Sequence, residues 1–243
     1  GEERLTQTAH ALAATLERKG VRAATPAAGF PMETDRGPGK MHVVSHKPVA
    51  VAAGLGHMGL HRNVIHPVFG SFVLLNTVFI DAEVDEHGTP LDYTPCLDCK
   101  LCSAACPTGA IAPDGVFHPV NCLTHTYREL IGGFTDWVET IADSKSSIDY
   151  RSKVSDVETM SMWQSLAYGP CYKSVYCIAV CPAGDEVIPE YLEDQKAFLE
   201  HVVKPLQLKT ETVYVLPGSD AESHAARNFP HKKIKRVGNG IRP

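Results

Sequence analysis

The cysteines of this chain are clustered in a pattern typical of iron–sulfur sites. Four of them fall in the segment CLDCKLCSAACP, residues 96–107, with the spacing C-x2-C-x2-C-x3-C-P. In this arrangement the first three thiolates bind one [4Fe–4S] cluster, and the fourth binds a different cluster. The short gaps wrap the backbone around one cube, and Pro107, which lacks an N–H group, breaks the local turn. The segment therefore predicts part of a two-cluster module.

A second set of cysteines can complete both clusters. Cys122 is followed by CYKSVYCIAVCP, residues 171–182, which keeps the x3-C-P ending. Ser174 stands where a C-x2-C-x3-C-P ending needs its first cysteine, and Cys171 lies three residues earlier and can substitute. The eight cysteines then fill eight positions. The predicted ligands are Cys96, Cys99, Cys102 and Cys181 for cluster 1, and Cys106, Cys122, Cys171 and Cys177 for cluster 2.

Other uses of these thiols fit the pattern less well. A four-cysteine zinc site favours two separated C-x2-C pairs and not one continuous run. Pairs two residues apart have poor disulfide geometry, so we expect a reducing, cytoplasmic protein without a disulfide framework. Two closely spaced clusters pass single electrons but do not themselves make or break substrate bonds. The cysteines predict electron transfer and leave open whether the chain is also an enzyme.

A glycine- and histidine-rich segment precedes the cysteines. GLGHMGLHRNVIHPVFGS, residues 54–71, leads into the apolar run SFVLLNTVFI, residues 71–80, and then into an acidic, turn-rich stretch. Together with CLDCKLCSAACPTGAI, residues 52–84 resemble the core of epoxyqueuosine reductases and of the related cobalamin-dependent reductive dehalogenases. The resemblance covers about residues 45–123 and part of 171–186.

The resemblance implies an α+β fold: a nitroreductase-like α/β core, which can be partial here, with a ferredoxin-like double [4Fe–4S] cluster module. It also implies that the core binds base-off cobalamin, whose cobalt the clusters reduce. Glycines let a backbone approach a flat macrocycle closely. The implied cobalamin contacts are Gly54, Leu55, Gly56, His57, Gly59, Asn63, Gly70 and Ser71. The alternative is that these glycines only shape a tight connection between a helix and a strand.

The sequence departs from that family in several places. His57 replaces the family's usual aromatic residue, the gap from Cys122 to Cys171 is long, and no residue matches the family's catalytic acid. The chain begins at Gly1, so either an upstream portion carries that acid or the chain lacks this chemistry. His57 is a hypothetical proton donor, because imidazole titrates near neutral pH.

His57, His61 and His66 suggest two further alternatives. His57 and His61, four residues apart, would share one helical face, where a zinc or mononuclear iron ion could bind. Ordinary polar packing of the three rings is the other interpretation.

The composition and the local patterns define the expected architecture. The chain has 243 residues, of which 44% are apolar and 21% charged, with a net charge of -5. Nothing suggests a basic nucleic-acid surface, and no apolar run reaches the roughly 18 residues of a membrane helix. We expect a core over 1–90, a cluster module over 91–186 with an insert at about 124–169, and a C-terminal helix and β-containing tail over 187–243.

Several secondary-structure elements are predicted from these patterns. Helices are expected over 3–19, ending near Gly20, over 47–53, over 188–203 and after a capping box at Ser219–Glu222. Strands are expected over 71–80, buried on both faces, and over 212–216. The basic segment HKKIKRV, residues 231–237, predicts a solvated edge strand or arm, or less simply an anion or partner site.

Three functions remain open from the sequence. The first is a cobalamin-dependent iron–sulfur reductase that removes oxygen or halide from a small organic or modified-nucleoside substrate, with electrons from a low-potential donor such as ferredoxin or flavodoxin. The second is a ferredoxin-like electron-transfer protein or subunit without cobalamin. The third, a structural or redox-sensing module, fits less well because sensors usually use one labile cluster.

Overall fold

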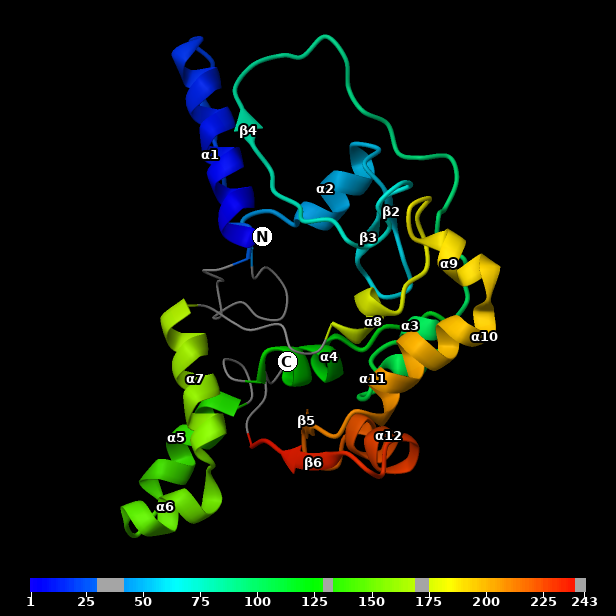
Figure 1. Cartoon of the computed structure of the whole chain (residues 1–243). Coiled ribbons are helices and arrows are strands. Elements are labelled where there is room, and N and C mark those ends of the chain that lie inside the picture. The colour runs from blue at the N-terminus through cyan, green and yellow to red at the C-terminus, as the bar shows by residue number, and fades with distance from the viewer. Residues whose placement is uncertain (30–41, 129–132, 169–174, 239–243) are drawn as a thin grey trace. The chain divides into compact units, whose positions relative to one another are not determined.

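The computed structural model describes residues 1–29, 42–128, 133–168 and 175–238, which form a mixed helix and strand structure (Figure 1). The chain divides into two compact units. Unit 1 comprises residues 1–99 and 181–195, and unit 2 comprises residues 100–180 and 196–243. The chain thus leaves unit 1 within the first cysteine run and returns to it at Cys181. The three-part division expected from the sequence stays a prediction.

Unit 1 begins with the predicted amphipathic helix, α1 (Glu2–Arg18). Gly20 follows its C-cap residue, Lys19, with φ +85, the left-handed conformation in which glycine commonly ends helices. The chain then forms β1 (Ala23–Ala24), which pairs antiparallel with β4 (Phe79–Ile80). The predicted end of the first helix is therefore confirmed.

A short helix and a hairpin form the centre of unit 1. The predicted helix α2 (His46–Ala52) carries Pro48 in its first turn, where the missing N–H has no intrahelical acceptor. The strands β2 (His57–Met58) and β3 (Val64–Ile65) pair antiparallel, with His57 opposite Ile65. α2 packs against both strands. Ile65 is fully buried, so the hairpin provides the core of this region.

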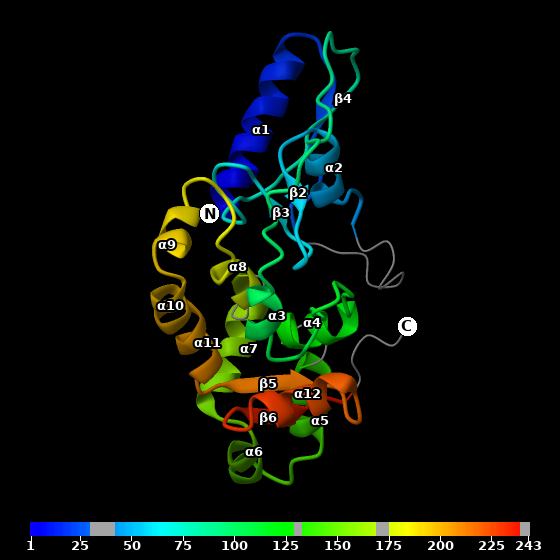
Figure 2. The same ribbon diagram turned by 90° about the vertical axis from the view of Figure 1, so that its right-hand side faces the viewer.

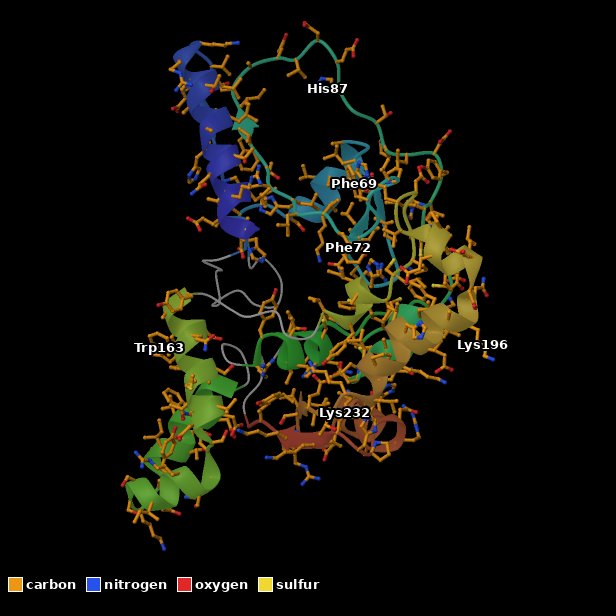
Figure 3. All side chains as sticks on the ribbon, viewed as in Figure 1. Phe69, Phe72, His87, Trp163, Lys196 and Lys232 are labelled. Carbon is orange, nitrogen blue, oxygen red and sulfur yellow. The ribbon has the colours of Figure 1, made fainter. Side chains whose placement is uncertain are left out.

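The prediction of a long buried strand over 71–80 is wrong. Only β4 is a strand, and Phe72 and Leu74 are 58% and 61% exposed; Phe72 is labelled in Figure 3. A β-branched and aromatic run becomes a buried strand only where neighbouring strands cover it, because β-propensity depends on context. In the described part of the chain, β1 alone pairs with this run, along two residues.

The part of unit 2 that carries Cys102, Cys106, Cys122 and Cys177 consists of short helices. α3 (Leu101–Ala105) packs against α8 (Tyr176–Ala179), and α4 (Pro119–Thr126) starts with a proline in its first turn. The expected insert contains α5 (Gly133–Ala142), α6 (Ser147–Lys153) and α7 (Asp156–Tyr168). Trp137 of α5 donates a hydrogen bond to the Tyr150 hydroxyl, at 2.8 Å, and so ties α5 to α6. The expected insert is thus helical over most of its described residues.

The end of the chain forms a small β–α–β unit within unit 2. β5 (Thr212–Val215) and β6 (Lys233–Arg236) pair in parallel, and α12 (Asp220–Asn228) connects them (Figure 2). The Ser219 hydroxyl accepts a hydrogen bond from the Glu222 N–H, as the capping box predicts. Val213, Val215, Ala221 and Ala225 form the core between these elements. The predicted strand and capping box are confirmed.

The helix predicted over 188–203 is interrupted. The structure has α9 (Ile188–Glu193), α10 (Gln195–Phe198), a π-helical turn η2 (Leu199–Val203) and α11 (Lys204–Leu208). Asp194 has extended backbone angles, φ -150 and ψ 92, which end α9. The apolar periodicity spans the break and so could not predict it. In the described ranges, no helix is both long and apolar enough to cross a membrane.

Candidate iron–sulfur centres

Unit 2 brings together three of the four cysteines predicted for cluster 2. Cys106 is the C-cap residue of α3, Cys122 lies on α4 and Cys177 lies on α8. Burial, together with the charges of Cys122 and Cys106, raises the pKa of the Cys177 thiol to about 12. Such mutual repulsion requires that the three sulfurs lie near one another. These thiols form a convergent group.

Unit 1 brings together three of the four cysteines predicted for cluster 1. Cys181 is buried, and Cys96 packs against it in a small core with Ile65 and Ala183. Burial raises the pKa of the Cys181 thiol, while a hydrogen bond from the Ala183 N–H lowers it and the charges of Cys99 and Cys96 raise it. The sequence separates Cys181 from Cys99 by more than eighty residues, so this convergence is a result of folding.

The remaining two predicted ligands are less directly placed. Cys102 is buried on α3 in unit 2, three residues after Cys99, and its charge is a smaller contribution to the raised pKa of Cys177. Its assignment to cluster 1 continues to rest on the sequence spacing. Cys171 and its alternative Ser174 lie outside the described residues. The choice between them stays a prediction.

Two residues of the first cysteine run have a left-handed backbone. Asp98 and Lys100, which flank Cys99, have φ of +52 and +63, a conformation uncommon outside glycine. The sequence signal is weak, although aspartate tolerates this conformation better than most residues.

The thiols fit [4Fe–4S] clusters better than single ions. Each convergent group contains a sulfur that accepts a backbone N–H hydrogen bond: Cys177 from Ile178, and Cys181 from Ala183. Hydrogen bonds to sulfur are a usual feature of iron–sulfur sites. Burial raises the pKa of these thiols, but a bound metal would deprotonate them. No three His, Cys, Asp or Glu side chains of the described ranges are arranged to hold one metal ion. The four thiolates of a cluster bind different irons, so they need not converge on the position of a single metal ion.

The chain's own atoms fill the space beside the glycines predicted to contact cobalamin. A Cβ atom added to Gly54 would overlap the Thr89 backbone, and one added to Gly56 would overlap the backbone of β3. At Gly59 the added atom would meet only the side chains of Ile65 and His61. One added to Gly70 would overlap the Ala183 carbonyl. Each glycine therefore has a packing reason to be glycine. Cobalamin contact at these positions stays a prediction.

The end of the glycine-rich segment interlocks with the chain after Cys181. The Asp185 N–H donates to the Pro67 carbonyl at 2.8 Å, and the Glu186 N–H donates to the Val68 carbonyl at 3.0 Å. Gly184, with φ +114, lies so close to Gly70 that a side chain on either residue would overlap the other's segment. Segment 66–71 therefore positions the Cys181 loop.

His57 is connected to the first cysteine run. Its Nδ1 lies 3.0 Å from the Thr94 hydroxyl, and that oxygen accepts a hydrogen bond of 3.2 Å from the Cys96 N–H. Thr94 can then donate its hydrogen to His57 Nδ1, which leaves Nε2 protonated on the neutral ring. Thr94 was not singled out from the sequence, where a lone threonine carries little information.

The expected helical pairing of His57 and His61 is wrong. His57 lies in β2 and His61 lies in the turn of the hairpin, because Gly59 and Arg62 (φ +58) reverse the chain between the strands. His61 Nδ1 accepts a hydrogen bond from the Asn63 N–H, and burial lowers the pKa of His61 to about 4. His66 Nδ1 likewise accepts from the Val68 N–H. Both rings serve turns, which supports polar packing.

The other predicted cobalamin contacts are divided between exposed and engaged side chains. Leu55 is 52% exposed. Asn63 accepts a hydrogen bond of 2.8 Å from the Lys47 ammonium and donates to the His61 carbonyl. Ser71 is buried and hydrogen-bonded to Cys181. Ser71 thus lies beside a predicted cluster ligand, which its sequence context did not reveal.

Unit 2 contains a cavity that the sequence did not predict. Its volume is about 260 Å³, and its lining includes Trp137, Tyr176 and Tyr214 together with the charged Arg128, Glu158 and Lys235. His125 also lines it: the ring accepts the Tyr214 N–H at Nδ1, so Nε2 carries the hydrogen. Burial lowers the pKa of His125 to about 4, which keeps this ring neutral. Tyr176, which lines the cavity, directly precedes Cys177 in the sequence.

The basic segment 231–237 contains the predicted edge strand, β6, in which Lys233 and Arg236 are exposed, but Lys232 and Lys235 are engaged in ion pairs. An anion or partner site here stays a prediction. Lys232 is buried, donates to Glu211 at 2.8 Å and to the carbonyls of Leu206 and Lys209, and is labelled in Figure 3. Lys235 pairs with Glu158 of α7 at 3.1 Å and with Asp136 of α5 at 3.6 Å. The positive charges therefore hold the tail to the rest of unit 2.

Comparison with known proteins supports the resemblance found in the sequence. No family model matches the chain. It is 32% identical over 82 residues to epoxyqueuosine reductase of Staphylococcus aureus, covering 34% of this chain and 21% of that protein. It is 33% identical over 87 residues to epoxyqueuosine reductase of Cyclobacterium marinum, covering 36% and 28%. The resemblance to epoxyqueuosine reductases is thus confirmed.

The match is local. The chain spans about a quarter of the length of the curated relatives it matches. A solved structure of epoxyqueuosine reductase from Streptococcus thermophilus aligns with a TM-score of 0.43 and 19% identity, covering 93% of this chain and 54% of that chain.

Proposed function

We propose that the chain is an iron–sulfur oxidoreductase that passes electrons through two [4Fe–4S] clusters to a bound cobalamin, for reductive removal of oxygen or halide from an organic substrate. Cys96, Cys99, Cys102 and Cys181 would hold one cluster. Cys106, Cys122, Cys171 and Cys177 would hold the other. The chain's similarity to epoxyqueuosine reductases supports the reductase part of this proposal.

One observation carries the proposal: distant cysteines converge in two groups, each with a thiol that accepts a backbone N–H. The groups are Cys96, Cys99 and Cys181 in unit 1, and Cys106, Cys122 and Cys177 in unit 2. Thiolates that lie close together repel one another, so free thiols would not be stabilised by this arrangement. The ligands of one cluster, by contrast, must lie close together. Hydrogen bonds to the sulfurs stabilise the negative charge that accumulates on reduction.

When bound, the clusters supply one-electron transfer and cobalamin supplies the substrate-reducing cobalt centre. The protein's contribution is to orient the substrate and to deliver protons. The hairpin β2–β3 presents His57, whose Nδ1 is engaged by Thr94, so Nε2 is the ring nitrogen left to face a substrate. To act as an acid the ring would have to be an imidazolium, in which Nδ1–H donates to the Thr94 oxygen and Nε2 carries the transferable proton. His57 would donate a proton to the leaving oxygen or assist halide departure. The glycine-rich segment 54–71 would carry the cobalamin contacts.

The same similarity supports the proposed substrate, while the electron donor is proposed from the chemistry that the reaction needs. Epoxyqueuosine, for which the relatives are named, is a modified nucleoside with an epoxide oxygen. Removing that oxygen requires a pair of electrons and protons, which a low-potential ferredoxin or flavodoxin would supply one electron at a time. A small organic halide is the corresponding substrate for the dehalogenase chemistry.

An alternative function is favoured by the glycine packing. Gly54, Gly56 and Gly70 each contact the chain's own backbone, so their presence is explained without a cofactor. No residue matches the family's catalytic acid. In this alternative, the chain is a ferredoxin-like electron-transfer protein or subunit that holds both clusters and no cobalamin.

Anaerobic purification with metal analysis tests both functions. The proposal predicts a broad absorption band from the clusters, about eight irons per chain for two [4Fe–4S] clusters, and corrin bands after hydroxocobalamin is supplied. Iron without bound corrin would support the electron-transfer alternative. A chain that contains no iron after anaerobic reconstitution with iron and sulfide would contradict both.

A further inference from the structure

Ser71 is a buried hydroxyl beside a predicted cluster ligand. Its side chain is hydrogen-bonded to the Cys181 thiol, and the two residues are 4% and 8% exposed. Cys181 packs in one core cluster with Ile65 of the hairpin and with Ala183 of the loop that follows it. Water therefore cannot replace the serine hydroxyl easily.

The backbone fixes this pair. Gly70, with φ +61, stands immediately before Ser71 and against the Ala183 carbonyl. Gly184 lies against Gly70, and two hydrogen bonds of 2.8 and 3.0 Å join residues 67 and 68 to residues 185 and 186. Because both sides of the contact are held by backbone, the distance between the hydroxyl and the sulfur is set by the fold.

We propose that Ser71 is a positioning residue for cluster 1: its hydroxyl donates a hydrogen bond to the Cys181 sulfur and makes the reduction potential of that cluster less negative. The inference rests on the proposed function, in which Cys181 is a cluster ligand. It assigns Ser71 to the iron–sulfur centre and not to the amide side arms or phosphate of cobalamin.

The direction of the effect follows from charge. Reduction adds an electron that is shared between the irons and the sulfurs, so the thiolate of a reduced cluster is more basic than that of an oxidised one. A hydrogen bond to that sulfur therefore stabilises the reduced form more and raises the potential. The same donation favours the thiolate over the thiol, and so acts on the pKa of Cys181 in the opposite direction to burial.

Redox titration of the iron-loaded full chain, followed by electron paramagnetic resonance, tests the inference. In Ser71→Ala we expect the potential of one cluster to become more negative while that of the other stays unchanged, so cluster 2 is an internal control. Ser71→Thr, which keeps the hydroxyl, should restore the wild-type potential. Ser165→Ala removes a hydroxyl that is equally buried, on α7 in unit 2, and should leave both potentials unchanged.

The outcomes separate this inference from the proposed function. If Ser71→Ala binds both clusters at wild-type potentials, the inference is wrong while the two-cluster assignment stands. If it instead loses affinity for hydroxocobalamin at unchanged potentials, Ser71 is a cobalamin contact. If the alanine variant fails to assemble cluster 1, Ser71→Thr and Ser71→Val are compared instead, because their side chains have the same shape and differ in the hydroxyl. Equal cluster 1 potentials in these two variants would overturn the inference. A wild-type chain without clusters refutes the proposed function itself.

Discussion

Gly70 and Ala183 are in backbone contact, and a Cβ atom added to Gly70 would overlap the Ala183 carbonyl oxygen. Gly70 belongs to the glycine-rich segment, and Ala183 follows Pro182 and the predicted ligand Cys181. The contact therefore couples a segment predicted to bind cobalamin with the loop that holds a predicted cluster. Loss of the contact should affect the cluster before any cofactor is considered.

Gly70→Ala should destabilise unit 1 and lower its iron content. The substitution combines a left-handed backbone, φ +61, with overlap against a buried backbone carbonyl. Gly20→Ala is the matched control, because Gly20 also has a positive φ, +85, but no atom within 4 Å of the added carbon. The control should cost about 1–2 kcal/mol from backbone strain alone and retain its iron. Equal losses of unfolding free energy and of iron in the two variants would contradict the role of the contact.

Lys232→Met should destabilise unit 2 more than the loss of an exposed ion pair would. The Lys232 side chain is 1% exposed and bonds to Glu211, whose carboxylate would be left buried. Removing one partner of a buried pair costs about 3 kcal/mol or more, although Lys209, 3.3 Å from Glu211, should moderate the loss. Urea unfolding measured by far-ultraviolet circular dichroism gives the change in unfolding free energy.

Lys204→Met is the control for that experiment. Lys204 pairs with Glu200 on the protein surface, where such pairs contribute about 0–1 kcal/mol. The double variant Lys232→Met with Glu211→Leu should recover part of the stability, since no unpaired charge remains. If Lys232→Met is no less stable than Lys204→Met, the burial of Lys232 does not have the consequence expected here.

His61 should make the protein less stable as pH falls below about 6.5, the ordinary pKa of histidine. Burial, with a contribution from Lys47, lowers its folded-state pKa to about 4. Between these two values the unfolded chain binds a proton that the folded chain does not, so acid favours unfolding. His61→Asn keeps an acceptor for the Asn63 N–H but does not titrate. The difference in unfolding free energy between wild type and variant should shrink by at most about 3 kcal/mol from pH 6.5 to pH 4, at about 1.4 kcal/mol per pKa unit. A difference that is independent of pH would show that His61 titrates normally.

The features that depended on local chemistry could be predicted from the sequence. The end of α1 at Gly20, the proline in the first turn of α2 and the Ser219 cap each depend on a few adjacent residues. The cysteine spacing likewise indicated the two thiol groups, because compact ligation restricts the gaps between ligands.

The features that depended on tertiary neighbours could not be predicted. Phe72 and Leu74 are exposed although their run has the composition of a buried strand, since one short partner covers it. The role of Gly70 depends on Ala183, more than a hundred residues away, and the burial of Lys232 depends on Glu211. A single sequence gives no indication of these pairings.

His57→Ala should slow reductive turnover if the ring donates a proton. General acid catalysis typically contributes about 10²–10⁴-fold, so a decrease of this order is expected in kcat. His87→Ala is the control, because His87 lies in the exposed stretch before the cysteines and is labelled in Figure 3. The assay uses epoxyqueuosine with a chemical low-potential reductant. Unchanged turnover in His57→Ala, with both clusters intact, would exclude this role and leave the Thr94 contact as a structural one.

Cys177→Ala and Cys181→Ala should each remove one cluster and spare the other. Cys177 converges with Cys106 and Cys122 in unit 2, and Cys181 converges with Cys96 and Cys99 in unit 1. A cluster that loses one of four thiolates is more exposed to solvent and to oxidation, so we expect about half of the iron to be lost from each variant. The two variants should retain different paramagnetic signals, because the surviving clusters have different surroundings. Loss of the same signal in both variants would mean that the two cysteines bind one cluster, and the assignment of eight thiols to two sites would then be wrong.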